Sequence, residues 1–205
     1  MTGTISKIFP TYERAEAAVR ELQTAGVPHS DISIVANNSD SWFSKDGVTK
    51  RVDRDGDGVD DRAEGAGTGA GIGAGIGVAA GLMAGLGLLA IPGVGPVVAA
   101  GWLVATAAGA AAGGITGGMV GALTQAGVSD EDAQVYAEGV RRGGTLVTAR
   151  VPDTSASQFE ALLDRSSLRT NELRSDYQKS GWKSFDERAK PYSAAEVREY
   201  RSSWQ

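Results

Sequence analysis

One acidic segment of this chain has residue types and a spacing that suit calcium chemistry. Within residues 53–64, carboxylates stand at positions 1, 3, 5, 9 and 12 of a twelve-residue loop, with glycine at position 6. A hard cation takes six to eight oxygen ligands, and the glycine allows the tight turn that brings them together. The backbone carbonyl at position 7 adds one more oxygen. The predicted calcium ligands are Asp53, Asp55, Asp57, Val59, Asp61 and Glu64.

Position 8 of this loop departs from the pattern of paired calcium sites. Paired helix–loop–helix sites have an apolar residue there, whereas this loop has Asp60. The loop is therefore more similar to the unpaired Asp-x-Asp-x-Asp-Gly repeats of thrombospondin type 3 modules. An unpaired loop is expected to bind calcium weakly, with a Kd of roughly 10⁻⁴ to 10⁻³ M. The alternative interpretation is an acidic linker that keeps the following segment in water.

The longest uncharged stretch of the chain follows directly, between Gly65 and Ser129. Glycine recurs in it at four-residue spacing, and residues four apart share one face of a helix. Each row of glycines predicts a helix face on which backbones can pack closely, an arrangement that is favoured inside lipid. The first row consists of Gly69, Gly73, Gly77, Gly81 and Gly85, and the second of Gly101, Gly109, Gly113, Gly117 and Gly121.

Two prolines and two glycines between Ile91 and Pro96 interrupt this stretch. Because such a run cannot continue a helix, we expect a helical hairpin with arms at about 67–90 and 97–126. At about 1.5 Å per residue, either arm is longer than a hydrocarbon core of about 30 Å. The favoured interpretation is a hairpin that associates with a membrane and with other copies of the chain. The alternative is a soluble oligomer in which the hairpins pack between subunits.

Alternating helix and strand patterns flank the uncharged stretch. Residues 4–9 predict a strand, Thr11 caps a helix, and residues 32–35 predict a second strand, so that two neighbouring parallel strands are expected. Ser129 begins another helix, residues 145–151 predict a strand, and Ser155 caps a further helix. The predicted fold class is α+β. It is a small βαβ…αβα sandwich-like domain, interrupted by the glycine-rich helical hairpin and followed by a polar C-terminal tail.

Changes in composition divide the chain into five parts. They are a first half-domain at 1–38, a polar linker with the acidic loop at 39–64, the glycine-rich hairpin at 65–127, a second half-domain at 128–165, and a polar, partly disordered tail at 166–205.

The two half-domains resemble a known family. The segments are Ile5–Phe9, Ala25–Pro28 with Asp31–Val35, and Asp130–Ala133 with Tyr136–Gly139 and Gly144–Val147. Together they are similar to the general stress protein 17M-like (YflT) domain family, over roughly residues 1–37 and 127–165. The resemblance implies a role in stress responses and supplies no catalytic residues. Many related proteins also carry a glycine-rich segment between the halves.

Composition narrows the function further. The net charge of −5 without a basic cluster argues against nucleic acid as a partner. The absence of cysteine excludes disulfides and thiolate metal sites, and His29 is the only histidine. No nucleophile, acid–base pair or small-molecule site stands out, so a non-enzymatic protein is expected. The first residues form no signal peptide, which predicts a place in the cytoplasm or on the cytoplasmic side of its membrane rather than secretion.

Overall fold

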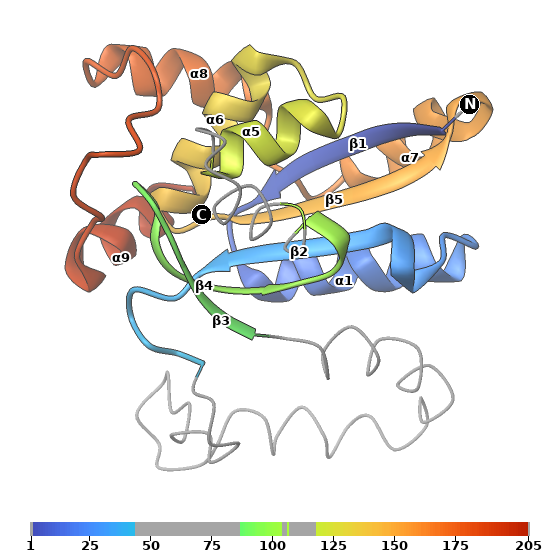
Figure 1. Ribbon diagram of the computed structural model, residues 1–205, viewed down its shortest axis with the longest axis horizontal. Helices are drawn as coiled ribbons and strands as arrows, with labels where there is room; N and C mark the ends of the chain where they lie inside the picture. Colours follow the sequence, from blue (N-terminus) through green and yellow to red (C-terminus); the bar gives the residue numbers. More distant parts are fainter. Residues whose placement is uncertain (1, 44–86, 104–105, 107–117, 205) are drawn as a thin grey trace.

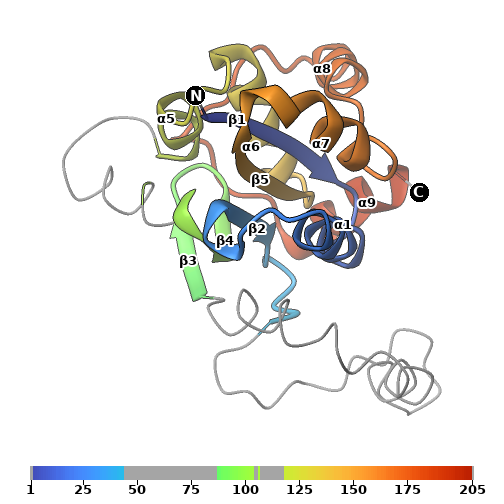
Figure 2. The same cartoon turned by 90° about the vertical axis from the view of Figure 1, so that its right-hand side faces the viewer.

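The computed structural model of the protein describes residues 2–43, 87–103, 106 and 118–204 (Figure 1). Within these residues a five-stranded sheet carries helices on both of its faces (Figure 2), which confirms the α+β class. The acidic loop at 53–64 lies outside the described residues, as do residues 44–86 and 107–117 of the linker and glycine-rich segment.

The sheet has the order β1-β5-β2-β4-β3, and all neighbouring strands are antiparallel. The strands are β1 (Thr2–Phe9), β2 (Ile32–Asn37), β3 (Gly87–Ile91), β4 (Gly95–Ala100) and β5 (Thr145–Pro152). The prediction that β1 and β2 are neighbours is wrong, because β5 lies between them. Since β5 is antiparallel to both, β1 and β2 still run in the same direction. Thr145 to Ala149 are all buried, as a central strand covered on both faces requires.

Two helices, α1 (Tyr12–Thr24) and α7 (Ala156–Leu163), cover one face of the sheet. Leu22 and Leu163 are fully buried there against Ile34 and Val147. The Thr11 hydroxyl accepts a hydrogen bond from the Arg14 amide at 3.3 Å, as predicted for the cap of α1. The 3₁₀ turn Asp153–Ser155 precedes α7, and Ser155 makes no capping hydrogen bond with its side chain.

Three helices pack on the opposite face, namely α5 (Gly118–Gln125), α6 (Asp130–Arg141) and α8 (Thr170–Lys179). Leu123, Val140 and Leu146 are fully buried in this second core. Ser129 caps α6 as predicted, because its side chain accepts a hydrogen bond from the Asp132 amide at 3.2 Å.

The prediction of helical arms at 67–90 and 97–126 is wrong for the described residues nearest the turn. Residues 87–100 form a β-hairpin, in which β3 pairs with β4 and β4 joins the sheet beside β2. Among the described residues of these arms, helix appears only at Trp102, Leu103 and Thr106 and in α5. A turn with positive φ at Gly93 (+73°) and Gly95 (+100°) links the strands, and this geometry favours glycine. None of the described helices combines the length and apolar character that a bilayer crossing requires.

The C-terminal residues form ordered structure where a partly disordered tail was predicted. Helix α8 buries Leu173 and Tyr177, and α9 (Ala194–Ser203) buries Val197. Ser193 and Glu196 form a capping box at the start of α9. Trp182, Phe185 and Trp204 are half-buried against the second core, so the spaced aromatic residues of this segment are packing residues.

Candidate functional site

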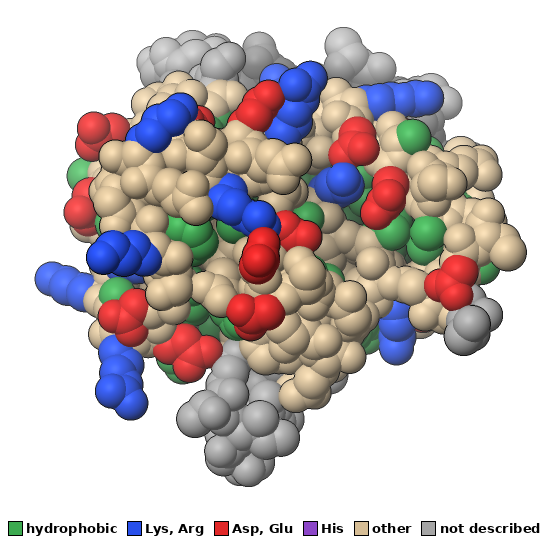
Figure 3. All heavy atoms as spheres, turned by 90° about the horizontal axis from the view of Figure 1, so that it is seen from above, with side chains coloured by type: hydrophobic (Ala, Val, Ile, Leu, Met, Phe, Trp, Pro, Cys, Tyr) green, Lys and Arg blue, Asp and Glu red, His purple; other side chains and the backbone are tan. Residues whose placement is uncertain are grey.

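An open polar cleft of about 790 Å³ lies between β1, α6, α7 and the start of α8. At its floor the Tyr136 hydroxyl donates a hydrogen bond to the Ser6 carbonyl at 2.7 Å and lies 3.3 Å from the Thr170 hydroxyl. At its rim Lys7 Nζ lies 2.7 Å from an oxygen of Asp164. The space-filling view shows acidic and basic side chains interspersed over the upper face of the molecule (Figure 3).

The cleft is suited to hydrogen bonding rather than to proton abstraction by its tyrosine. Burial raises the pKa of Tyr136 to about 12; the hydrogen bond with Thr170 opposes this shift, and the carboxylates of Asp132, Glu160 and Asp164 add to it. The phenol is therefore protonated near pH 7. Lys7 and Asp164 engage each other, and the Ser129 hydroxyl donates a hydrogen bond to Asp132 Oδ2 at 2.8 Å, so polar groups of the lining are paired with one another.

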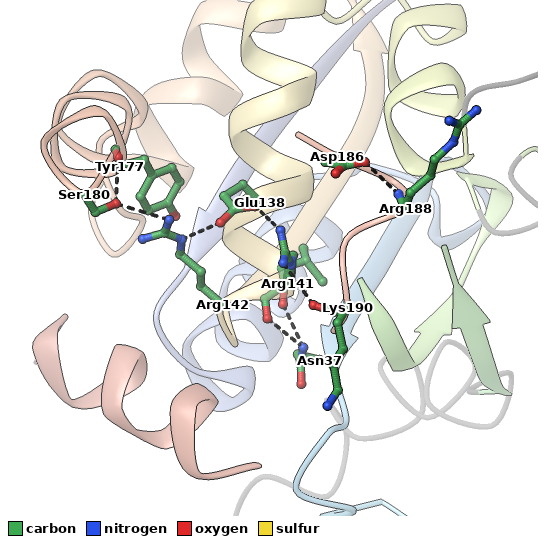
Figure 4. Close-up of polar contacts among 10 residues, drawn as sticks. Asn37, Glu138, Arg141, Arg142, Tyr177, Ser180, Asp186, Arg188 and Lys190 are labelled. Atoms are coloured by element: carbon green, nitrogen blue, oxygen red, sulfur yellow. Dashed lines mark hydrogen bonds and ion pairs between the residues drawn. The ribbon is translucent and has the colours of Figure 1, made fainter. Parts of the chain in front are cut away.

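A second cluster, which we call the Glu138 junction, lies where α6 meets the C-terminal segment (Figure 4). The Glu138 side chain is fully buried and accepts a hydrogen bond from Arg142 Nε at 2.6 Å and a longer one from Arg141 Nη1 at 3.3 Å. The Arg142 guanidinium lies over the ring of Tyr177 at 4.2 Å and over that of Tyr200 at 4.7 Å. A buried carboxylate is thus paired with a cation that is itself covered by two aromatic rings.

The charge of Arg142 in the Glu138 junction follows from the groups around it. Burial lowers the pKa of Arg142, but the hydrogen bond and the charge of Glu138 raise it by more, so the net shift is upward. Arg142 is therefore cationic near pH 7.

The Glu138 junction extends to the end of β2 and to the residues that follow it. Asn37 at the end of β2 donates hydrogen bonds from its amide to the Val140 and Arg141 carbonyls, at 3.0 and 3.2 Å. Arg201 of α9 donates to Asp40 at 2.7 Å and to the Gly143 carbonyl at 2.8 Å. The C-terminal helix is thereby tied both to the turn that follows α6 and to Asp40, which lies between β2 and segment 44–86.

The C-terminal segment also packs on the β3–β4 turn. A Cβ on Gly93 would lie 2.7 Å from both the Asp186 carbonyl oxygen and the Glu187 Cα, and a Cβ on Gly95 would lie 2.8 Å from Pro191. The glycines at this turn are therefore needed both for positive φ and for the close approach of residues 186–191.

The predicted site residues are only partly described. All six predicted calcium ligands, Gly69 to Gly85 of the first glycine row, and Gly109, Gly113 and Gly117 of the second lie outside the described residues. Gly121 lies in α5. Gly101 follows β4 with φ +98°, so its predicted place in a helical row is wrong. Within the described ranges no three His, Asp or Glu side chains group as a metal site.

Sequence reasoning missed the Glu138 junction, although one signal for it was present. Glu138 and Arg142 stand four residues apart, a spacing that places them on the same face of a helix. The partners on the other side, Tyr177 and Tyr200, come from a segment that had been predicted to be a tail.

Comparisons with models of protein families, with curated proteins and with solved structures found no match. The resemblance to the general stress protein 17M-like family stays a prediction.

Proposed function

We propose that this chain is a non-enzymatic, self-associating protein, in which the folded α+β domain carries uncharged glycine-rich segments that pack against those of other copies. The observation that carries the proposal is the uncharged stretch between Gly65 and Ser129 with its four-residue glycine spacing. In water, glycine lowers helix stability by roughly 1 kcal/mol per residue relative to alanine. Glycine at this spacing is favoured where it lets backbones pack closely.

The attachment of this stretch to the domain favours association between copies over a membrane-spanning hairpin. Segment 44–86 links Phe43 to Gly87, and both of these residues belong to the same folded domain. A single crossing of a bilayer would place its two ends on opposite sides. The turn at 91–95, which a spanning hairpin would carry across the bilayer, is part of the sheet and packs against residues 186–191.

Replacing both Gly77 and Gly113 by leucine is expected to abolish self-association, because each leucine would hold two backbones apart. The measurement is the mass of the full chain by light scattering in detergent-free buffer. The control is Gly127→Ala, outside the glycine rows, where a Cβ meets nothing within 4 Å and the positive φ of +94° adds only local backbone strain. An oligomer of unchanged mass in the leucine variant would refute the role of the glycine rows.

A second candidate function is association with one leaflet of a membrane without crossing it. The absence of charge from Gly65 to Ser129 favours it, and it is compatible with ends that lie on one domain. Flotation of the purified chain with phospholipid vesicles tests it. Retention of the chain by the vesicles after an alkaline carbonate wash supports it, and recovery of a discrete particle in the wash contradicts it.

We further propose that calcium binds the acidic loop. Titration calorimetry of the full chain is expected to give a Kd of roughly 10⁻⁴ to 10⁻³ M. The Asp55→Asn, Asp57→Asn double variant is expected to lose this binding, because two of the predicted carboxylate ligands become neutral. Asp130→Asn, at an exposed carboxylate at the start of α6, is the control. Equal heats of calcium binding for the loop variant and the wild type would show that the loop is an acidic linker without a calcium site.

A further inference from the structure

The two edge strands of the sheet differ in the hydrogen bonding of their outward backbone groups. At the β1 edge, the Ile8 carbonyl accepts a hydrogen bond from the Leu168 amide at 2.8 Å, and the Ser6 carbonyl accepts one from the Tyr136 hydroxyl at 2.7 Å. The outward carbonyls of Ser6 and Ile8 are thus satisfied within the domain. At the other edge, β3 pairs only with β4 among the residues that the structure describes.

The register shows which backbone groups of β3 point outward. Ala90 lies opposite Pro96, whose carbonyl accepts a hydrogen bond from the Asn38 amide and therefore faces β2. The backbone polar groups of one residue in a strand point to the same side, so Pro96 directs none towards Ala90. Ala90 and Pro96 are therefore a non-hydrogen-bonded pair of the ladder. The N–H and C=O of Ala90 point away from the sheet, and by alternation those of Leu88 do so too.

The β3 edge lacks the features that prevent an edge strand from pairing with another chain. Monomeric proteins place lysine, proline or a bulge on such strands. Strand β3 reads Gly-Leu-Leu-Ala-Ile, without charge and regularly paired, and Ala90 is exposed. The packing of Gly93 and Gly95 against the C-terminal segment holds the turn beside it in place.

We infer that β3 is an interface at which two copies of this chain pair edge to edge, extending the antiparallel sheet across a two-fold axis. This inference rests on the proposed self-association and names one surface for it. Copies with a net charge of −5 repel each other, and an uncharged edge is where they can approach. Centring the pair on Leu89 sets Leu88 of each copy opposite Ala90 of the other, so that both outward residues of β3 are satisfied.

Cysteine cross-linking tests the pairing, because the native chain has no cysteine. Leu89 would face Leu89 of the second copy in a non-hydrogen-bonded pair with Cα atoms about 4.5 Å apart, within disulfide range. Leu89→Cys is expected to give a covalent dimer under mild oxidation. Thr24→Cys, at the exposed end of α1, is the control and is expected to stay uncross-linked. An oligomeric Leu89→Cys protein without the cross-link would overturn the inference.

Proline at position 90 tests the outward hydrogen bonds. Ala90→Pro removes an N–H that β4 does not use, so circular dichroism is expected to match the wild type. The dissociation constant of the pair is expected to rise about tenfold or more, and Ala90→Ser, which keeps the N–H, is expected to leave it unchanged. Unaltered association of a folded Ala90→Pro protein contradicts the inference alone. A wild type that is monomeric throughout contradicts the proposed function as well.

Discussion

Arg142→Ala is expected to lower the free energy of unfolding by about 3–5 kcal/mol, because it leaves the carboxylate of Glu138 buried without its closest partner. Glu138 is fully buried, and its 2.6 Å contact with Arg142 is much shorter than its 3.3 Å contact with Arg141. The variant also loses the cation over the rings of Tyr177 and Tyr200. Urea denaturation followed by circular dichroism measures the change.

Two further variants separate the buried ion pair from general effects of losing an arginine. Replacing Glu138 and Arg142 together by leucine is expected to cost less than Arg142→Ala, because the buried carboxylate is removed with its closest cation. Arg141 then loses its 3.3 Å contact with Glu138 but keeps its hydrogen bond to the Lys190 carbonyl. Arg174→Ala breaks a half-exposed pairing with Glu131 and Asp132 and is expected to change the free energy by about 1 kcal/mol or less. Equal losses for Arg142→Ala and Arg174→Ala would show that the Glu138 junction does not stabilise the fold.

Gly101→Ala is expected to destabilise the protein by roughly 2–5 kcal/mol. Gly101 has φ +98°, and a Cβ there would collide with the Ile32 carbonyl oxygen and with Ser33. If Gly101 lay inside a helix, alanine would instead raise the free energy of unfolding, since it favours helix over glycine by roughly 1 kcal/mol. The sign of the change in unfolding free energy therefore distinguishes a turn at the end of β4 from the predicted helix.

Gly26→Ala is the matched control for this variant. Gly26 has the same φ of +98°, but a Cβ there would meet nothing within 4 Å. Its expected loss is only the backbone strain, about 1–2 kcal/mol. If Gly26→Ala and Gly101→Ala cost the same, the collision with β2 makes no contribution.

Local patterns predicted the elements whose signals are complete within a few residues. Thr11, Ser129 and the Ser193–Glu196 pair cap helices in the structure as their residue types indicate. Strand β5 was predicted from its run of β-branched and apolar residues. The α+β class followed from these elements.

The β3–β4 hairpin was mispredicted because its sequence fits two interpretations. Short apolar runs do not distinguish a buried helix from a strand by periodicity, and the glycine spacing that precedes Gly87 favoured helix. The same Pro-Gly turn that would end a helix also joins two strands. Pairing with β2 decides between them, and this pairing joins residues 60 to 66 positions apart, from Asn37 with Val97 to Ile34 with Ala100.

Two other features depend on long-range contacts and were therefore not predicted. They are the position of β5 between β1 and β2 and the Glu138 junction. Ser6 of β1 pairs with Thr148 of β5, and no local signal fixes the insertion of β5 between β1 and β2. Arg142 is covered by Tyr177 and Tyr200, whose spacing in a polar segment gave no sign of a shared partner.

The mass of the wild-type full chain in detergent-free buffer, measured by light scattering over a wide range of concentration, tests the central claim most directly. The account predicts a discrete particle whose mass is a multiple of the 21.1 kDa chain and which falls apart in the Gly77→Leu, Gly113→Leu variant. A particle of 21.1 kDa at every concentration, with and without phospholipid vesicles, would contradict self-association.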